Sequence, residues 1–300
     1  MLKVVEKIEE ANCVTHSGTM HADDVFSTAF LEIYLKSVKV FRTNNINADD
    51  YKDKIVYDVG RGKFDHHAED ILKRENGIPY AAFGLLWQEY GLDLLKKTNI
   101  ENPEEVFVAI DRDFIEGIDA DDNGVFPKIE APYSVKTVSD IIKIFNPSYD
   151  SSQDSNTQFF RACSIAKTIF TEEIIAQEAK IKAKKIIEEK IKKCKKKYLL
   201  LDEFLPYEDT LLSMEEASNI GFVIFPSNRG GYAIKTVPKS KEDRTYRIDV
   251  PEEYAGLEGK ELEEKSGIKG FTFCHRTRFM MSTKSKMTAI KVVKSILQED

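Results

Sequence analysis

The sequence contains little cysteine, and its four cysteines are scattered along the chain. Cys13, Cys163, Cys194 and Cys274 form no CxxC pair. Zinc fingers and disulfide scaffolds both need cysteines at close, regular spacings, so the pattern argues against both kinds of domain. Reduced thiols in a cytosol-like compartment are the simplest interpretation, and we expect a cytoplasmic protein.

Long apolar runs and an excess of positive charge are lacking too. No stretch approaches the roughly 18 consecutive apolar residues of a membrane-spanning helix, and the first 13 residues are too charged for a signal peptide. We therefore expect a protein that is neither secreted nor embedded in a membrane. The net charge of −7 argues against a surface that is basic throughout, although it leaves room for a local basic groove that binds phosphates.

The chain has 300 residues, 42% of them apolar, which is enough for one large domain or two ordinary ones. In its first half, strand-like and helix-like patterns alternate. The spacing predicts strands over residues 13–15, 38–42 and 55–59, and helices over residues 23–36, 80–97 and 104–118. This alternation indicates an α/β fold, with a doubly wound, mostly parallel sheet in a domain over residues 1–155.

Residues 156–198 are predicted to form a helical connector, because residues 156–197 contain no glycine or proline. One uninterrupted helix of this length would span roughly 60 Å, so we expect one or two breaks. Between residues 180 and 197 there are ten lysines and two glutamates. Such a run is typical of a solvated helix face, and the alternative is a tract that contacts an RNA backbone.

Residues 199–300 lose the alternation and predict a smaller α+β domain. The pattern indicates strands over residues 199–201, 221–225, 232–237 and 271–275, and a final helix over residues 286–297. The sequence NRGG at residues 228–231 predicts a hairpin turn between the second and third of these strands.

Histidine is scarce but concentrated. Four of the five histidines lie in the first 70 residues, namely His16, His21, His66 and His67. His16 and Asp58 each end a predicted strand, and the carboxyl ends of parallel strands face one crevice. If residues 65–67 and the aspartates of residues 119–122 reach the same crevice, the carboxylates repel one another unless a cation binds.

This predicted nest of imidazoles and carboxylates suits phosphate-ester hydrolysis. Mixed histidine and aspartate ligands favour Mn²⁺, with Co²⁺, Fe²⁺ or Zn²⁺ as alternatives, over Mg²⁺ or Ca²⁺. One or two such ions would activate a water molecule and neutralise phosphoryl oxygens. Asp58, central in the sheet, is the candidate bridge between two ions. The turn that begins at Ser17 precedes a helix and could present amide groups to a phosphate.

With these residues the sequence resembles the DHH phosphoesterase superfamily, which includes RecJ-type exonucleases, short-RNA nucleases and manganese pyrophosphatases. It is most similar to one branch, the melanocyte-proliferating-gene protein family of metal-dependent hydrolases. Seven motifs carry the resemblance over nearly the whole chain: THSGTMHAD at residues 15–23, DVG at 58–60, FDHH at 64–67, DADDNG at 119–124, FNP at 145–147, VPK at 237–239 and GFTFCH at 270–275.

The resemblance implies a metal-carrying N-terminal domain, a C-terminal domain that covers the substrate, and phosphodiester hydrolysis, with 3′–5′ exonuclease action on RNA proposed for the branch. It implies metal ligands at His16, Asp23, Asp58, His66 and one aspartate of the cluster at residues 119–122, with Asp119 favoured over Asp122. His21 is a further candidate ligand. The resemblance further implies that His67 contacts the scissile phosphate and that Asp65 orients the neighbouring histidines. At His21 the pyrophosphatase-like members more often have aspartate, so the number and identity of the ions stay open.

Several of these residues have a structural alternative. Asp23 could be a plain helix N-cap, Asp122 could belong to a helix-ending turn, and His21 could merely pack near the site. A basic group in the C-terminal domain could bind substrate phosphates in bidentate fashion or could be ordinary surface charge. It consists of Lys239, Arg247, His275, Arg276 and Arg278.

Two other functions remain open at this stage. One is hydrolysis of a small phosphorylated molecule, such as a nucleotide, a cyclic dinucleotide or pyrophosphate. The other is a metal-stabilised RNA-binding or regulatory protein without turnover, which predicts RNA affinity with ordinary salt dependence and no hydrolysis. The sequence does not determine the oligomeric state.

Overall fold

A computed structural model describes residues 1–67 and 72–299. The chain divides into two compact units, Met1–Ala179 and Lys180–Asp300. None of the helices within the described ranges has the length and apolar character needed to span a membrane.

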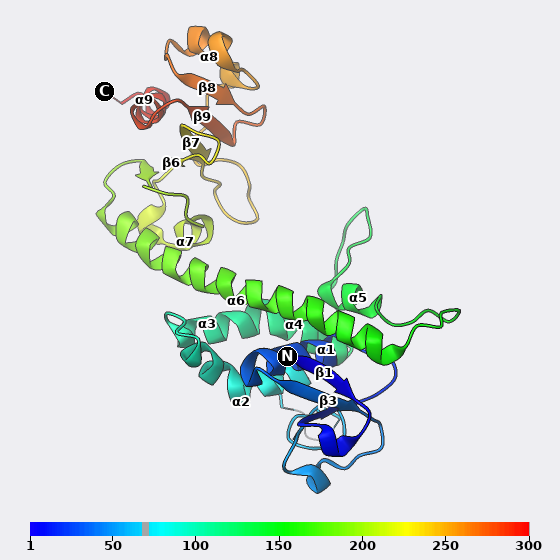
Figure 1. The fold of residues 1–300 in the computed structure, drawn as a ribbon. Coiled ribbons are helices and arrows are strands. Elements are labelled where there is room, and N and C mark those ends of the chain that lie inside the picture. Colours follow the sequence, from blue (N-terminus) through cyan, green and yellow to red (C-terminus); the bar gives the residue numbers. More distant parts are fainter. Residues whose placement is uncertain (68–71, 300) are drawn as a thin grey trace. The chain divides into compact units, whose positions relative to one another are not determined.

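The first unit contains a four-stranded sheet in which every neighbouring pair is parallel (Figure 1). Its strands are β1 (Leu2–Val5), β2 (Cys13–Thr15), β3 (Val38–Arg42) and β4 (Ile55–Val56), in the order β1-β3-β2-β4. Cys13 of β2 lies opposite Ile55 of β4, so these two strands end side by side. The predicted α/β fold class is confirmed, while β1 is a strand that the sequence pattern did not indicate.

The helices of the first unit enclose an aromatic core. They are α1 (Ala22–Leu35), α2 (Ala82–Lys97), α3 (Pro103–Ile110), α4 (Glu116–Asp122), α5 (Val138–Lys143) and short 3₁₀ turns at Ile8–Glu10 and Ala48–Tyr51. A π-helical turn, η3 (Asp111–Ile115), separates α3 from α4 where one continuous helix was predicted. Phe30, Phe83 and Trp87 pack around Phe170 with ring centroids 5.2–6.2 Å apart. This packing fixes α1 and α2 against one another near the ends of β2 and β4.

Phe170 belongs to α6 (Ser155–Lys193), a helix of 39 residues. The expectation of one or two breaks in this segment was wrong. No glycine or proline interrupts it, and each unit buries an apolar stripe of the helix, with Phe159 and Phe170 in the first unit and Ile187 and Ile191 in the second. Tertiary packing at both ends therefore supports the continuous helix.

The second unit is built on a five-stranded sheet of order β5-β6-β7-β9-β8. Its strands are β5 (Tyr198–Leu200), β6 (Phe222–Pro226), β7 (Tyr232–Thr236), β8 (Phe271–Cys274) and β9 (Met280–Thr283), and its helices are α7 (Glu208–Ser213), α8 (Gly259–Ser266) and α9 (Lys286–Leu297) with 3₁₀ turns at Glu215–Ala217 and Glu252–Tyr254. Only the β5–β6 pair is parallel. The predicted hairpin joins β6 and β7, and its Gly231 has a φ of +69° and leaves no space for a Cβ atom beside the Thr283 carbonyl.

Candidate metal centre

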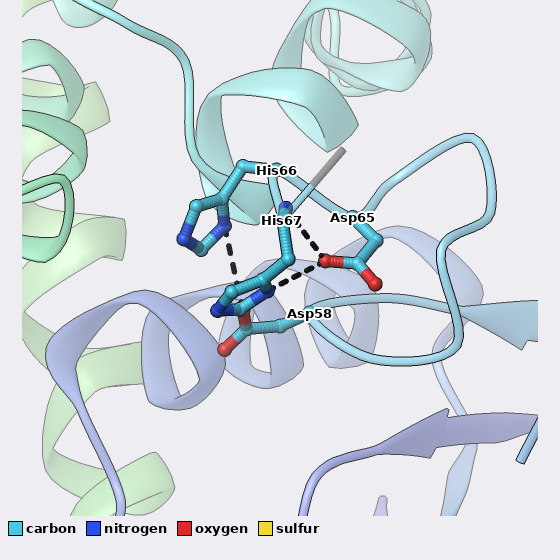
Figure 2. A group of neighbouring side chains, drawn as sticks. All are labelled: Asp58, Asp65, His66 and His67. Carbon is cyan, nitrogen blue, oxygen red and sulfur yellow. Dashed lines mark hydrogen bonds and ion pairs between the residues drawn. The ribbon is translucent and has the colours of Figure 1, made fainter. Parts of the chain in front are cut away.

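The centre is built where β2 and β4 end. His16 follows β2, and Asp58 follows β4 on the neighbouring strand. Asp58 has a φ of +54°, an uncommon backbone conformation for a residue other than glycine. Its N–H donates to the carbonyl of Phe64 at 2.9 Å, which folds the loop back and places residues 65–67 beside it (Figure 2). The clustering that the strand ends predicted is therefore present in the structure.

One group of four side chains has the geometry of a metal site. Asp23, Asp58, His66 and Asp122 each offer a ligand atom, and these atoms all lie within 4.8 Å of one another. His66 is buried between two of the carboxylates, with Nε2 3.0 Å from Asp122 Oδ2 and Nδ1 3.4 Å from Asp58 Oδ1. A divalent cation could bind all four groups at once.

A second group shares Asp58 with the first. His16 Nε2 lies 3.2 Å from Asp58 Oδ2 and 3.4 Å from Asp24 Oδ2. The two oxygens of Asp58 thus face different histidines, as a carboxylate between two ions requires. The sequence patterns did not identify Asp24 as a candidate ligand. Its position directly after Asp23, in the first turn of a buried helix, is the signal that could have identified it.

Asp65 and His67 form a pair at the edge of the centre (Figure 2). Asp65 Oδ1 accepts hydrogen bonds from the backbone N–H of His67 at 3.0 Å and from its ring Nδ1 at 2.7 Å. Asp65 Oδ2 accepts the N–H of Arg61 at 2.6 Å. The side chain of His67 is 62% exposed, whereas that of Asp65 is buried. With Nδ1 directed at Asp65, the Nε2 atom of His67 stays available to a substrate.

Buried polar atoms that lack a hydrogen-bond partner indicate whether these residues fit a metal ion. Across residues 1–67 and 72–299, few buried side-chain nitrogen or oxygen atoms lack a hydrogen-bond partner, and five of them belong to the centre: His16 Nε2, Asp24 Oδ2, Asp58 Oδ1, Asp58 Oδ2 and His66 Nδ1. Buried polar atoms are costly without partners. Coordination would satisfy all five, and this mixed nitrogen and oxygen set suits Mn²⁺, Fe²⁺, Co²⁺ or Zn²⁺.

Burial and, after it, repulsion between the carboxylates shift the pKa values of the cluster. Burial raises the pKa of Asp24 to about 7, and burial with the charges of Asp58 and Asp122 raises the pKa of Asp23 well above its usual value. Burial alone would lower the pKa of His16, but the carboxylates of Asp58 and Asp24 raise it to about 9. In the metal-free chain, protons therefore offset charge that a cation would neutralise.

The structure places Asp119 and Asp122 in different surroundings. Asp122 contacts His66 and also His21, whose Nδ1 lies 3.3 Å from Asp122 Oδ1. Burial would raise the pKa of Asp122, but His66 and His21 lower it. Asp119 Oδ2 is instead engaged by Arg74 at 2.7 Å, and Asp119 belongs to none of the candidate ligand groups among the described residues. Of the two, Asp122 is the residue with ligand geometry, whereas the sequence pattern favoured Asp119.

Hydrogen bonds with Asn44 and Arg42 hold the turn that starts at Ser17. The N–H of Ser17 donates to Asn44 Oδ1 at 2.9 Å, so this amide is already engaged. Arg42 is buried and donates to the carbonyls of His16 and Gly18 and to Ser155 at the start of α6.

A cavity of about 410 Å³ opens onto the centre and is lined by His16, His21, Asn44, Asp58, Val59, Gly60, Arg61, Asp65, His67 and Asp122.

The basic candidates of the second unit are dispersed. Arg247 donates to the carbonyls of Ala217 and Ile220, and Arg278 donates to the carbonyl of Val250, so both guanidinium groups bind backbone. Lys239 and Arg276 are exposed and do not line a described cavity. His275 lines a groove of the second unit, and its ring centroid lies 4.5 Å from that of Phe279.

This groove, of about 1040 Å³, lies over β7, β9 and β8 and contains residues that the sequence reasoning missed. Phe273, Lys235 and Arg229 line it, together with hydroxyl groups such as that of Ser282. Lys235 is partly buried over the ring of Phe279, with Nζ 4.1 Å from the ring centroid. The contributing residues come from separate strands and the hairpin turn. Phe273 and Arg229 lie in stretches noted in the sequence, but no single motif indicates that they share a groove.

Comparisons with known proteins agree with the motifs. The family model described as "Uncharacterised protein family (UPF0160)" matches residues 12–297. A Saccharomyces cerevisiae protein named MYG1 protein is 28% identical over 99% of this chain and 98% of its own length. A Dictyostelium discoideum MYG1 protein is 27% identical over 92% of this chain and 93% of its own. A Homo sapiens protein named MYG1 exonuclease is 25% identical over 95% of this chain and 85% of its own.

No solved structure gives a significant match to the chain.

Proposed function

The chain belongs to the uncharacterised protein family UPF0160, and because it also contains a candidate metal centre we propose that it is a metal-dependent exonuclease. We propose that it hydrolyses phosphodiesters of RNA or short oligonucleotides from the 3′ end, with Mn²⁺ as the cofactor. The observation that carries the proposal is Asp58, whose two unsatisfied oxygens are shared by two ligand groups. The human relative's name, MYG1 exonuclease, supports the nucleic-acid substrate.

The ligands in this proposal are His16, Asp24, Asp58, Asp23, His66 and Asp122. When bound, two divalent ions supply an activated water molecule and neutralise charge on the phosphoryl oxygens. Asp65 holds His67 through Nδ1, so that Nε2 can donate a proton or a hydrogen bond to the phosphate or to the leaving oxygen. Asp23, Asp24 and Asp58 are buried, and a substrate would reach the centre through the cavity that opens onto it.

The groove of the second unit supports a polymeric substrate. Single-stranded nucleic acid binds where aromatic rings stack on bases and cations contact the backbone, and Phe273, Lys235 and Arg229 offer both kinds of group. We expect the double variant Phe273→Ala with Lys235→Gln to bind a 12-nucleotide RNA roughly 10-fold or more weakly, because one stacked base contributes about 1–3 kcal/mol.

The binding measurement is fluorescence anisotropy at several salt concentrations. Loss of one phosphate contact should make the plot of log affinity against log salt less steep by about 0.7 for a single strand. Lys260 in α8 is exposed and does not line the groove, so Lys260→Gln serves as the matched control. Equal affinity and equal slope in the double variant and the wild type would show that RNA does not bind in this groove.

The proposed activity itself is tested with a 5′-labelled single-stranded RNA and metal-stripped protein. We expect resupply with Mn²⁺ to yield a ladder shortened from the 3′ end, and we expect Co²⁺, Zn²⁺ and Mg²⁺ to be less effective. Uncut RNA together with hydrolysis of a nucleotide, a cyclic dinucleotide or pyrophosphate, detected by chromatography of the products, would replace RNA by a small molecule. Uncut RNA, no hydrolysis of these small molecules and retained RNA affinity would identify a binding protein without turnover.

A further inference from the structure

Arg74 is a buried cation outside the ligand groups. It lies in the segment between His67 and α2, and its guanidinium is shared by two aspartates of the helical segment that ends at Asp122. Arg74 Nε and Nη2 donate to Asp111 at 2.9 and 2.7 Å, and Nη2 also donates to Asp119 at 2.7 Å. The guanidinium stacks on the ring of Tyr80 at 4.0 Å. Such a fork of charge-assisted hydrogen bonds holds its partners in one geometry.

Asp119 connects Arg74 to the metal centre. It lies one helical turn before Asp122 in α4, and its other oxygen, Oδ1, accepts the N–H of Gly84 in α2 at 3.1 Å. A Cβ atom at Gly84 would lie 2.0 Å from Asp119 Oδ2, so the two helices approach as closely as glycine permits. The Asp119 carbonyl also accepts the N–H of Asn123, which ends α4. The position of Asp122 is therefore tied to that of Asp119.

The contact between Asp119 and Gly84 also affects a second candidate ligand, Asp23. Asp23 accepts the N–H groups of Ala82 and Phe83, at 3.0 and 2.7 Å, at the start of the helix that Asp119 contacts through Gly84. Asp119 is fully buried, and Arg74 is the cation that contacts it. Without Arg74, a carboxylate would remain buried without an ionic partner at the junction that positions both Asp23 and Asp122, and α4 would have to shift or solvate it.

We propose that Arg74 is a positioning residue of the metal centre, which acts through Asp119 to fix Asp122 and Asp23. This assignment rests on the metal-dependent function proposed above. It does not require RNA to be the substrate, because Arg74 reaches the metal ligands through Asp119, which contacts α2 at Gly84. Groups that orient metal ligands typically contribute 10–100-fold to metal affinity.

The test is Mn²⁺ affinity, measured by equilibrium dialysis of the full-length protein. We expect Arg74→Met to bind Mn²⁺ about 10–100-fold more weakly than the wild type. Arg74→Lys should recover part of this loss, because it keeps the charge but not the fork. The double variant Arg74→Met with Asp119→Asn should bind more tightly than Arg74→Met alone, since no buried carboxylate is left unpaired. Arg112→Met, which removes an exposed guanidinium paired with Asp113, is the matched control and should bind normally.

Folded Arg74→Met protein that binds Mn²⁺ as tightly as the wild type would overturn the assignment. If Arg74→Met does not fold, Asp119→Asn decides: weaker Mn²⁺ binding than Asp113→Asn supports the assignment, and equal binding overturns it. A lowered melting temperature with unchanged Mn²⁺ affinity would show a purely structural role and would also overturn it. Wild-type protein that binds no Mn²⁺ would overturn the proposed function as well, so the two failures are distinguishable.

Discussion

Asp58→Asn is expected to abolish hydrolysis and to remove the stabilisation that bound Mn²⁺ gives to the wild type. The substitution keeps the size of the side chain but removes the carboxylate shared by both ligand groups. Its effect on activity should exceed the roughly 10–100-fold that a partner outside the ligand set contributes. In the metal-free protein the substitution has two opposing effects. It relieves repulsion with Asp23, whose pKa is raised by burial and then by the charge of Asp58, and it removes an attraction to His16, whose pKa Asp58 helps to raise. We therefore expect little net change in the stability of the metal-free protein.

Thermal unfolding with and without metal measures the loss of metal binding. In the wild type, Mn²⁺ at about 100 times its dissociation constant should add about 2.7 kcal/mol to the free energy of unfolding. In Asp58→Asn the metal-free melting temperature should change little, and the shift with Mn²⁺ should largely vanish. Asp53→Asn, an exposed carboxylate just before β4, is the control that should change neither quantity. A variant that keeps the wild-type metal content would contradict the role of Asp58 as the shared ligand.

The strand-end argument explains which parts of the centre could be predicted. His16 and Asp58 each follow a short apolar strand, and adjacent parallel strands must end together, so their meeting follows from local pattern and sheet geometry. Residues 65–67 could be expected nearby because only a short loop joins them to Asp58. The family resemblance, confirmed by a match over residues 12–297, supported the same set of residues.

Other features depend on contacts between distant residues. Asp119 and Asp122 lie one turn apart in α4, and the difference between them arises from Arg74, which is 45 residues away from Asp119 in the sequence. Asp24 faces inward because the buried α1 begins directly at the centre. The groove of the second unit combines residues from four strands and a turn. Arg247 and Arg278, which resemble phosphate ligands in the sequence, bind carbonyls instead. Periodicity contains no information about such pairings.

His67→Gln is expected to reduce turnover by about 10²–10⁴-fold while metal content stays normal, because general acid or base groups contribute in this range. The ring of His67 is largely exposed at the edge of the centre, and its closest carboxylate is Asp65 at 2.7 Å, whereas Asp58 lies 3.9 Å away. The residue therefore has the geometry of a group that touches substrate and is oriented by Asp65. Turnover at saturating Mn²⁺ and bound metal per chain are the two measurements.

Asp65→Asn separates orientation from direct action. Burial raises the pKa of Asp65, but the hydrogen bonds from His67 and from the N–H of Arg61 outweigh this and lower it, so Asp65 accepts as a carboxylate. The amide holds the ring of His67 less well, and we expect a smaller loss of turnover than in His67→Gln. Because Asp65 acts through His67, the double variant should be no less active than His67→Gln alone. If His67→Gln instead loses metal, then His67 is a ligand, and the group formed by Asp58, Asp65, His66 and His67 is the second metal site.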